Sequence, residues 1–330
     1  MDCEWNDKIF SVTAESFESL ALEIFQYQYA NNAIYKQYVD ALKIDVSTIN
    51  TVIKIPFLPI NFFKSLQVIT GKFETTTVFE SSGTGSLTRS KHFVKDISLY
   101  IKSLKIGFEK FYGPITEYCI LGLLPSYQEN ENSSLIFMVN ELMKISNHSQ
   151  NAFCKNDNLF EKLKLLEENK QKVLLVGVSF ALLDFAEMHQ LSLSNAIIME
   201  TGGMKGRRVE ITREEVHQKL KLAFGVDAIH SEYGMTELLS QSYSVENGIF
   251  CSPLWMKVFI RDEEDPMNVQ NNIHKKPLQG ALNIIDLANV HSCSFIASED
   301  IGRLYSNENF EVLGRLDASE LRGCSQLVIN

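Results

Sequence analysis

The sequence predicts an α/β protein with mostly parallel sheets flanked by helices, plus a small β-rich subdomain near its C-terminal end. Between residues 96 and 225, apolar runs of strand length alternate with helical patterns, an order typical of a mostly parallel sheet. Beyond Gly248 the pattern changes to short apolar runs separated by proline-containing turns, which indicates the β-rich subdomain. With 330 residues, 45% of them hydrophobic, the chain can fill more than one core.

The N-terminal segment predicts a helical cap. Apolar residues between Ser16 and Leu42 recur at helical spacing, and Asn31-Asn32 marks a break between two helices. Pro56 and Pro59 interrupt the aromatic segment that follows, so we expect it to pack against or line an apolar pocket rather than form a central strand. Residues 73–79 are rich in threonine and predict a strand.

The middle of the chain supplies the alternating elements. Asp96 is the expected N-cap of a helix that runs to about Tyr112 and ends at Gly113-Pro114. Thr212-Arg-Glu-Glu215 is a capping box that opens another helix, which Gly225 closes. Further strands are expected at 118–124, 173–178 and 196–199, and further helices at 133–145, 158–169 and 180–189.

Composition argues against several classes of protein. A formal net charge of -10 disfavours a nucleic-acid partner, because no basic stripe is present to displace counterions from phosphates. No apolar run is long enough to span a bilayer, and the first residues lack the pattern of a signal peptide. The six cysteines are scattered without a Cys-x-x-Cys pair, which disfavours a disulfide framework and a zinc site. We therefore expect a cytoplasmic protein with reduced thiols.

Ser81–Lys91 is the first candidate site. Its glycines and small hydroxyls follow an expected strand, where backbone N–H groups and side chains can bind phosphate oxygens and Arg89 or Lys91 can add charge. It is not a Walker A loop, because no lysine follows Gly85 in the required register. A loop without a ligand is the alternative interpretation.

A glycine pair follows the third expected strand of the parallel sheet, in the segment Glu200-Thr-Gly-Gly-Met-Lys-Gly-Arg-Arg208. Gly202 and Gly203 carry no side chains, so the backbone there can pack flat against a planar ring. Taken singly, the segment favours a tight turn with a solvated basic end.

Ile229–Leu239 combines the residue types of a nucleotide site. Tyr233 offers an aromatic face, Gly234 permits a close backbone approach, and Thr236 and Glu237 add a hydroxyl and a carboxylate. Taken alone, the segment favours a helix entry with Thr236 as N-cap and Glu237 in the first turn.

Three other polar residues are ambiguous by themselves. Asp300 can bind ribose hydroxyls and Arg315 can bridge ribose and phosphate, yet both also fit surface charges. The seven histidines show no metal-ligand spacing, and we interpret His230 as structural.

Together and in this order, these segments resemble the motifs of the adenylate-forming superfamily of acyl and aryl ligases. Ser81-Ser-Gly-Thr-Gly-Ser-Leu-Thr-Arg89 is similar to the Ser-Ser-Gly-Thr-Thr-Gly-x-Pro-Lys phosphate loop, with Gly85 and Arg89 as departures. Tyr233-Gly-Met-Thr-Glu237 matches the Tyr-Gly-x-Thr-Glu element. Ser-Glu-Asp300-Ile-Gly-Arg is similar to the Thr-Gly-Asp element, and Gly314-Arg315-Leu-Asp317 to the Gly-Arg-x-Asp hinge.

Within that superfamily, the chain resembles the LuxE-type acyl-protein synthetases of bacterial fatty acid reductase complexes. The segments that carry this likeness are Glu200–Arg208, His230–Ser240 and Arg322-Gly-Cys324, and the whole resemblance spans about Ile55 to Val328. It implies the fold of the N-terminal domain of adenylate-forming ligases, with the C-terminal ligase domain absent because the chain ends just past the hinge.

The resemblance also implies site residues. Those expected at ATP are Ser82, Gly83, Thr84, Gly85, Ser86, Gly202, Gly203, Tyr233, Gly234, Thr236, Asp300 and Arg315. Tyr233 would stack on adenine, and Asp300 and Arg315 would hold the ribose. The expected catalytic residues are Arg89, Thr236, Glu237 and Cys324, with Glu237 as the ligand of Mg²⁺.

The implied function is ATP-dependent activation of a carboxylic acid, with a fatty acid expected, as an acyl adenylate. The acyl group would pass to Cys324 and then to a protein partner such as a reductase or carrier. A flexible tail would let Cys324 reach the adenylate, although a small apolar role for this cysteine is the alternative. Two other functions stay open: a truncated aryl- or acyl-CoA ligase related to phenylacetate-CoA ligase, and a non-catalytic nucleotide- or acyl-binding subunit.

Four segments are expected along the chain: a helical cap at 1–50, nucleotide- and acyl-binding α/β subdomains at 51–247, the β-rich subdomain at 248–312, and a hinge-like tail with Cys324 at 313–330. The candidates for an acyl pocket are Phe57, Phe62, Phe63 and the segment 176–180.

Overall fold

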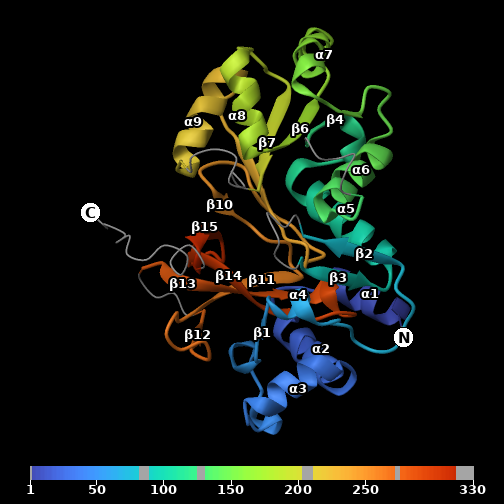
Figure 1. The fold of residues 1–330 in the computed structure, drawn as a ribbon, viewed down its shortest axis with the longest axis vertical. Coiled ribbons are helices and arrows are strands. Elements are labelled where there is room, and N and C mark those ends of the chain that lie inside the picture. Colours follow the sequence, from blue (N-terminus) through green and yellow to red (C-terminus); the bar gives the residue numbers. More distant parts are fainter. Residues whose placement is uncertain (1, 82–88, 125–130, 203–210, 272–275, 317–330) are drawn as a thin grey trace. The chain divides into compact units, whose positions relative to one another are not determined.

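The computed structural model describes residues 2–81, 89–124, 131–202, 211–271 and 276–316. Contacts divide these residues into two units (Figure 1). Unit 1 contains the described residues of Met1–Glu74 and Leu254–Asn330, and unit 2 those of Thr75–Pro253. The four expected segments stay a prediction. None of the helices in these ranges is both long and apolar enough to cross a membrane.

Unit 2 alternates strands and helices along the chain. Its elements are β2 (Thr77–Glu80), β3 (Lys91–Val94), α5 (Ile97–Tyr112), η3 (Ile115–Glu117), β4 (Cys119–Leu123), α6 (Ser134–Ser146), β5 (Ala152–Phe153), α7 (Asn156–Glu168), β6 (Val173–Val178), α8 (Ser179–Met188), β7 (Ala196–Thr201), α9 (Arg213–Phe224), β8 (His230–Tyr233), β9 (Ser242–Ser244) and β10 (Ile249–Phe250). All six residues of β6 are buried, as expected for a strand covered on both faces.

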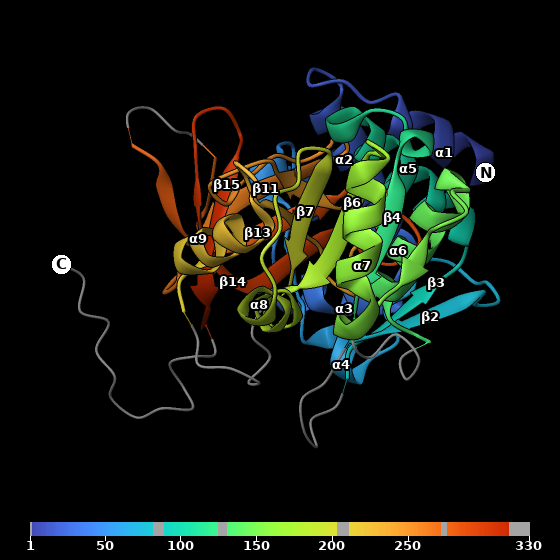
Figure 2. The same cartoon turned by 90° about the horizontal axis from the view of Figure 1, so that it is seen from above.

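The main sheet of unit 2 has the strand order β5-β4-β6-β7-β8-β9. Neighbours from β5 to β8 pair in parallel, and only the β8–β9 pair in this sheet is antiparallel. Helices α8 and α9 lie on one side of the sheet and α5 and α6 on the other (Figure 1), while β4, β6 and β7 run side by side (Figure 2). The predicted α/β class with a mostly parallel sheet is therefore confirmed.

Local capping explains where the two best-marked helices of unit 2 begin and end. The side chain of Asp96 accepts a backbone N–H of the first turn of α5, and Gly113 follows the helix with φ of 76°. At α9, Thr212 and Glu215 form a reciprocal capping box, and Gly225 takes the left-handed conformation with φ of 65°. The predicted start and end of each helix are confirmed, because each of these signals acts within one turn of the chain.

Unit 1 combines helices with an antiparallel sheet. Its elements are α1 (Asp2–Phe10), α2 (Phe17–Asn31), α3 (Ala33–Ala41), η1 (Val46–Thr48), η2 (Val52–Lys54), β1 (Leu58–Pro59), α4 (Phe62–Ser65), β11 (Met256–Arg261), β12 (Val269–Gln270), β13 (Leu278–Asp286), η4 (Leu287–Asn289), β14 (Phe295–Leu304) and β15 (Phe310–Arg315). The strand order is β15-β14-β13-β11-β12, and β1 adds two residues parallel to β14. The expected β-rich region is confirmed as this sheet.

Buried polar side chains tie the N-terminal helices of unit 1 to its C-terminal sheet. The break predicted between the first two long helices is confirmed, with Asn32 capping α3 through its side chain. The amide of Gln28 donates to the carbonyl oxygens of Asn289 and Val290 at 3.0 and 3.1 Å, and its oxygen accepts the N–H of Ser294 at 3.0 Å. The helices and the sheet therefore share one core.

Candidate functional site

The candidate site of unit 2 lies where neighbouring parallel strands end. Strands β6, β7 and β8 are parallel neighbours, with Val178 beside Thr201 and Thr201 beside Glu232 in register. Gly202 follows β7 and Gly234 follows β8, so both predicted glycines reach the carboxyl edge of the same sheet. In open parallel sheets, this edge is where ligands bind.

Gly202 has a conformation that favours glycine. Its φ is 69°, in the left-handed region, and its carbonyl oxygen accepts the hydroxyl of Ser179 at 2.7 Å. Ser179 is the first residue of α8, so the turn after β7 is fixed to the start of the helix after β6. The predicted glycine turn is thus anchored rather than free.

Tyr233 is the last residue of β8 and its ring lies in a largely buried environment. The ring centroid is 5.7 Å from that of Phe250, at a tilt of 56°. The residue before it, Glu232, leaves no room beside Gly234: a Cβ there would lie 2.4 Å from Oε1 of Glu232. A side chain at this position would therefore displace the carboxylate of Glu232.

The segment after β8 is a turn, not a helix. The chain turns at Thr236 and Glu237 and returns as β9, antiparallel to β8. The helix entry with Thr236 as N-cap, which the isolated segment favours, is therefore wrong. Ring nitrogen Nδ1 of His92 lies 2.9 Å from the carbonyl oxygen of Thr236. Because a carbonyl only accepts, Nδ1 carries the proton of this hydrogen bond.

Helix α5 holds the far side of the same turn. The hydroxyls of Ser103 and Ser240 are 3.1 Å apart, and the amide of Gln241 donates to the hydroxyl of Tyr100 at 3.3 Å. All four residues are buried. The turn that contains Thr236 and Glu237 is therefore fixed by hydrogen bonds from two other elements, β3 and α5.

The predicted phosphate loop connects the two strands of a hairpin. Strands β2 and β3 pair antiparallel, and Ser81 and Ser90 close the stem, with Ser81 N–H donating to Ser90 O at 3.1 Å. The strand expected at 73–79 forms only from Thr77 and belongs to this hairpin rather than to the parallel sheet. Arg89 lies on the stem, 3.8 Å from the carboxylate of Glu80.

Several predicted site residues lie outside the described residues. They are Ser82, Gly83, Thr84, Gly85, Ser86, Gly203 and Cys324. Their roles stay predictions. Among the described cysteines, Cys119, Cys154 and Cys293 are buried and Cys251 is half-buried, and all four are free thiols.

Asp300 and Arg315 are brought together in unit 1. They face each other in register on β14 and β15, and Nε of Arg315 is 3.6 Å from Oδ1 of Asp300. A second carboxylate, Glu299, is 3.0 Å from Nη2 of Arg315. The Arg315 side chain remains 62% exposed, so its guanidinium is accessible while it is oriented by two acids.

A carboxylate that was not singled out in the sequence is the centre of a buried network. Glu200 accepts the hydroxyls of Ser179 at 2.8 Å and Ser231 at 2.9 Å. Arg213 and His217 approach the same carboxylate at 3.4 and 3.6 Å. Burial acts to raise the pKa of Glu200, but hydrogen bonding to His217 and the charge of Arg213 together lower it below its usual range. Glu200 is therefore an anion that ties together β7, β8, α8 and α9.

A second buried carboxylate has the opposite behaviour. Glu232 accepts a very short hydrogen bond from the hydroxyl of Thr201 and lies opposite Tyr243 on β9. Burial raises the pKa of Glu232 to about 7, since this hydrogen bond only partly offsets it and the charge of Glu200 adds to it. The carboxyl group directly before Tyr233 thus titrates near neutral pH.

Sequence reasoning did not single out His92, Glu232 or the bonding partners of Glu200. A signal existed for His92, because alternation along β3 places it on the same buried face as Val94. Burial lowers the pKa of His92 to about 4, so this residue is neutral at pH 7. No comparable local signal marks Glu232, since its partners come from other strands.

The predicted metal ligand, Glu237, is buried in the turn after β8. In the described ranges, no three histidine, cysteine, aspartate or glutamate side chains gather as a metal site. A nucleotide-bound Mg²⁺ needs only one or two protein carboxylates, because phosphates and water supply the remaining oxygens. The role of Glu237 at Mg²⁺ stays a prediction.

The residues predicted to form an acyl pocket belong to different units. In unit 1, Phe57 lines a cavity, Phe63 is buried, and Phe62 packs on the ring of Tyr38 with centroids 5.7 Å apart. The segment 176–180 belongs to β6 and α8 of unit 2, where it is buried. Of these candidates, Phe57 is the one found at the cavity of unit 1.

Comparison with known proteins identifies the family and the fold. The model of the family described as "Acyl-protein synthetase, LuxE" matches residues 10–330. A search among curated proteins finds no significant match. ATP-bound MatB from Rhodopseudomonas palustris is similar in structure, with 12% identity and a TM-score of 0.53, over 84% of this chain and 52% of that one.

Two other solved structures are similar. An ATP-bound RpMatB-BxBclM chimera is 13% identical with a TM-score of 0.54, over 74% of this chain and 49% of the other. An open conformation of 2-hydroxyisobutyryl-CoA ligase with 2-HIB-AMP and CoA is 9% identical with a TM-score of 0.62, over 94% and 77%. The chain spans about half the length of the first two proteins. It has the fold of adenylate-forming ligases and belongs to the LuxE family of acyl-protein synthetases.

Proposed function

We propose that the protein activates a carboxylic acid with ATP as an acyl adenylate and then transfers the acyl group to a cysteine thiol. A fatty acid is the expected substrate. Membership of the LuxE family over residues 10–330 supports this proposal. The observation that carries it is that Tyr233–Glu237 lies at the carboxyl edge of the parallel sheet. His92 bonds this segment to the hairpin β2–β3, and the sequence between these two strands contains the phosphate motif.

In the first step, a carboxylate oxygen of the acid attacks the α-phosphorus of ATP, the bond from that phosphorus to the bridging oxygen breaks, and pyrophosphate leaves. Both reactants are anions, so the protein accelerates the step through hydrogen-bond donors and positive charge. We assign donation to the phosphates to Thr236 and the Ser82–Ser86 loop, and positive charge to Arg89. No side-chain nucleophile is required.

Glu237 is the proposed protein ligand of Mg²⁺. The buried carboxylate offers the oxygen ligand that this hard cation prefers. Bound there, Mg²⁺ would neutralise part of the phosphate charge. Tyr233 would stack on adenine, with Gly202, Gly203 and Gly234 allowing close backbone contact, and Asp300 and Arg315 would bind the ribose.

In the second step, the thiol of Cys324 attacks the carbonyl carbon of the acyl adenylate. The bond between that carbon and the phosphate oxygen breaks, AMP leaves, and the thiol loses its proton as the thioester forms. A second thioester exchange would pass the acyl group to a protein partner such as a reductase or carrier. A cytoplasmic location, where thiols stay reduced, belongs to the same proposal.

The test is mass spectrometry of the protein after incubation with ATP and a panel of carboxylic acids, together with acid-dependent exchange of pyrophosphate into ATP. We expect exchange with at least one acid and a mass increase of one acyl group. Cys324→Ser should keep the exchange and lose the acyl label, whereas the matched Cys251→Ser should keep both. Retained label in Cys324→Ser contradicts the cysteine role.

The same assays separate the alternatives. Release of acyl-CoA on addition of CoA, without acyl-protein, would identify a truncated CoA ligase. Absence of exchange with fatty and aromatic acids alike would identify a subunit that binds nucleotide or acyl group without chemistry.

A further inference from the structure

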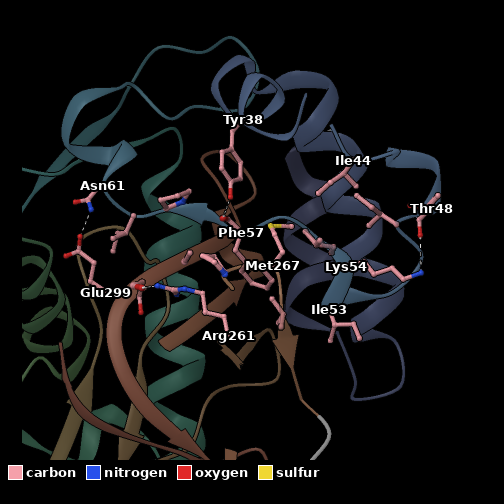
Figure 3. Close-up of a pocket in the computed structure, with 18 residues that line it drawn as sticks. Tyr38, Ile44, Thr48, Ile53, Lys54, Phe57, Asn61, Arg261, Met267 and Glu299 are labelled. Atoms are coloured by element: carbon pink, nitrogen blue, oxygen red, sulfur yellow. Dashed lines mark hydrogen bonds between the residues drawn. The ribbon is translucent and has the colours of Figure 1, made fainter. Parts of the chain in front are cut away.

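Unit 1 contains a cavity of about 400 Å³ (Figure 3). Its wall comes from α3 and the chain that follows as far as Asn61, from the end of β11 and the connection to β12, and from residues 297–299 of β14. Most of the wall is apolar, through side chains that include Ile44, Ile49, Ile53, Phe57, Met267 and Val269. Small-molecule sites have volumes of roughly 300–1,000 Å³ and are mainly apolar with a few polar groups. The cavity has the size and lining of such a site.

One charged group of the cavity wall is deeply buried. Arg261, the last residue of β11, is only 9% exposed, and it is one of the residues that line the cavity (Figure 3). Nη1 donates to Leu282 O at 3.0 Å and to Asn283 Oδ1 at 2.8 Å, and Nη2 donates to Ser298 O at 2.7 Å. A register shift between β13 and β14 lies at Leu282, whose carbonyl oxygen also accepts the hydroxyl of Ser298 at 2.9 Å.

These bonds orient the guanidinium without neutralising it, since their acceptors are uncharged. In the described residues, no carboxylate lies within ion-pair distance of Arg261. Glu299 also lines the cavity, but its carboxylate binds Arg315 at 3.0 Å and accepts the amide of Asn61. The charges of Glu299 and Glu263 act on Arg261 without a direct ion pair. Because a buried charge without a direct partner is costly, an anion in the cavity would stabilise the guanidinium.

The remaining donors of Arg261 match a carboxylate. A guanidinium has five N–H groups, and the three bonds to the protein leave two of them for a ligand. Two parallel N–H donors bind the two oxygens of a carboxylate in the strongest form of this pair. One arginine beside Glu299 favours a single negative charge over a phosphate group with two.

We propose that this cavity binds an aliphatic monocarboxylate, with its carboxylate on Arg261 and its chain along the apolar wall. Choosing a fatty acid as the probe rests on the proposed function, whereas the site rests on the cavity and Arg261. Lys54 also lines the cavity and is exposed, and it adds positive charge where an anionic ligand enters.

The test is calorimetric titration of the full-length protein with decanoate in the absence of ATP. We expect decanoate to bind and decanol, which has the same chain without the charge, to bind at least about tenfold more weakly, because charge-assisted hydrogen bonds are lost. Arg261→Gln should weaken decanoate binding about tenfold or more. Val269→Trp should also weaken it, by filling the cavity from a half-buried position on β12.

Arg303→Gln is the matched control, because Arg303 lies in the same sheet and pairs with Glu311 outside the cavity. It should bind decanoate as the unaltered protein does. If Arg261→Gln does not fold, Arg261→Lys keeps the charge without the paired donors and should still bind more weakly. If the Arg261 and Val269 variants bind decanoate as tightly as the unaltered protein does, the cavity is not the binding site. If the unaltered protein binds decanol as tightly as decanoate, Arg261 does not bind the carboxylate.

The failure of this proposal is distinguishable from that of the proposed function. Tyr233→Ala should lose exchange of pyrophosphate into ATP and keep the decanoate binding that depends on Arg261. Exchange without any Arg261-dependent binding overturns the cavity site alone. Arg261-dependent binding without exchange supports the cavity site and contradicts the adenylation function.

Discussion

Nδ1 of His92, on β3, lies 2.9 Å from the carbonyl oxygen of Thr236, in the turn after β8. This hydrogen bond connects the hairpin β2–β3 to the turn that contains Glu237. Burial keeps the imidazole neutral by lowering its pKa to about 4, so the bond persists unchanged across the physiological pH range. Strand β3 is thereby connected to the turn that contains Thr236 and Glu237.

Replacing His92 should disturb nucleotide activation more than folding. His92→Phe keeps a buried ring but removes the donor to Thr236, so we expect pyrophosphate exchange to fall about tenfold or more while the protein remains folded. The measurement is exchange at saturating ATP, with circular dichroism to confirm folding. His189→Phe is the control, because His189 packs on Phe160 and should tolerate another ring. Equal exchange in both variants would show that the His92 bond does not matter.

Glu232 should make stability depend on pH. Its pKa is raised from 4.5 to about 7 in the folded protein, so the folded state binds more protons between these values and stability falls as pH rises through them. Glu232→Gln removes this cost. The free energy of unfolding of the variant, relative to that of the unaltered protein, should therefore increase by about 3 kcal/mol as the pH rises from 4.5 to 8. Urea unfolding at several pH values measures the difference. A difference in stability between the two proteins that does not change with pH would contradict the raised pKa.

Glu200 should be essential for the stability of unit 2. Glu200→Ala would leave Arg213 without its buried anion and would remove the acceptor that the hydroxyls of Ser179 and Ser231 share, so we expect a loss of about 3–5 kcal/mol. Urea unfolding compares this variant with Glu214→Ala, an exposed change in the same unit that should cost far less. Similar losses in the two variants would mean that the network contributes nothing special.

Replacing Asp300 or Arg315 should weaken the binding of ATP more than it destabilises the fold. We expect Asp300→Asn and Arg315→Met each to raise the KM for ATP about tenfold, as charge-assisted hydrogen bonds to the ribose are lost. Steady-state exchange kinetics at varied ATP measure this effect. Arg303→Met removes a cation of the same strand pair and serves as the control. An unchanged KM in both site variants would remove these residues from the nucleotide site.

Features that depend on neighbouring residues in the sequence could be predicted well. The ends of α5 and α9 follow from Asp96, Gly113, Thr212 and Gly225, because caps act over a single turn. The same reasoning failed at Thr236, where pairing of β9 with β8 determines the backbone. An N-cap preference is worth only about 1 kcal/mol, which strand pairing readily outweighs.

The buried charges could not be predicted because distant segments create them. Glu200 meets Ser179, Arg213 and Ser231 only after β7, β8, α8 and α9 have packed. Arg261 is held inside unit 1 by acceptors that lie 21 to 37 positions later in the chain. Motif order predicted the candidate nucleotide residues, whereas the groups that hold them in place required the fold.

Unit 1 is built from the two ends of the described chain. Its Gln28 is hydrogen-bonded to Asn289 and Val290, which follow it by more than 260 positions. During synthesis, α2 and α3 therefore leave the ribosome long before the sheet that completes their core. At about 5–20 residues per second, the roughly 180 residues of unit 2 delay that sheet by on the order of ten seconds or more. Unit 2 can fold in this interval, while the N-terminal helices keep apolar surface that chaperones can recognise.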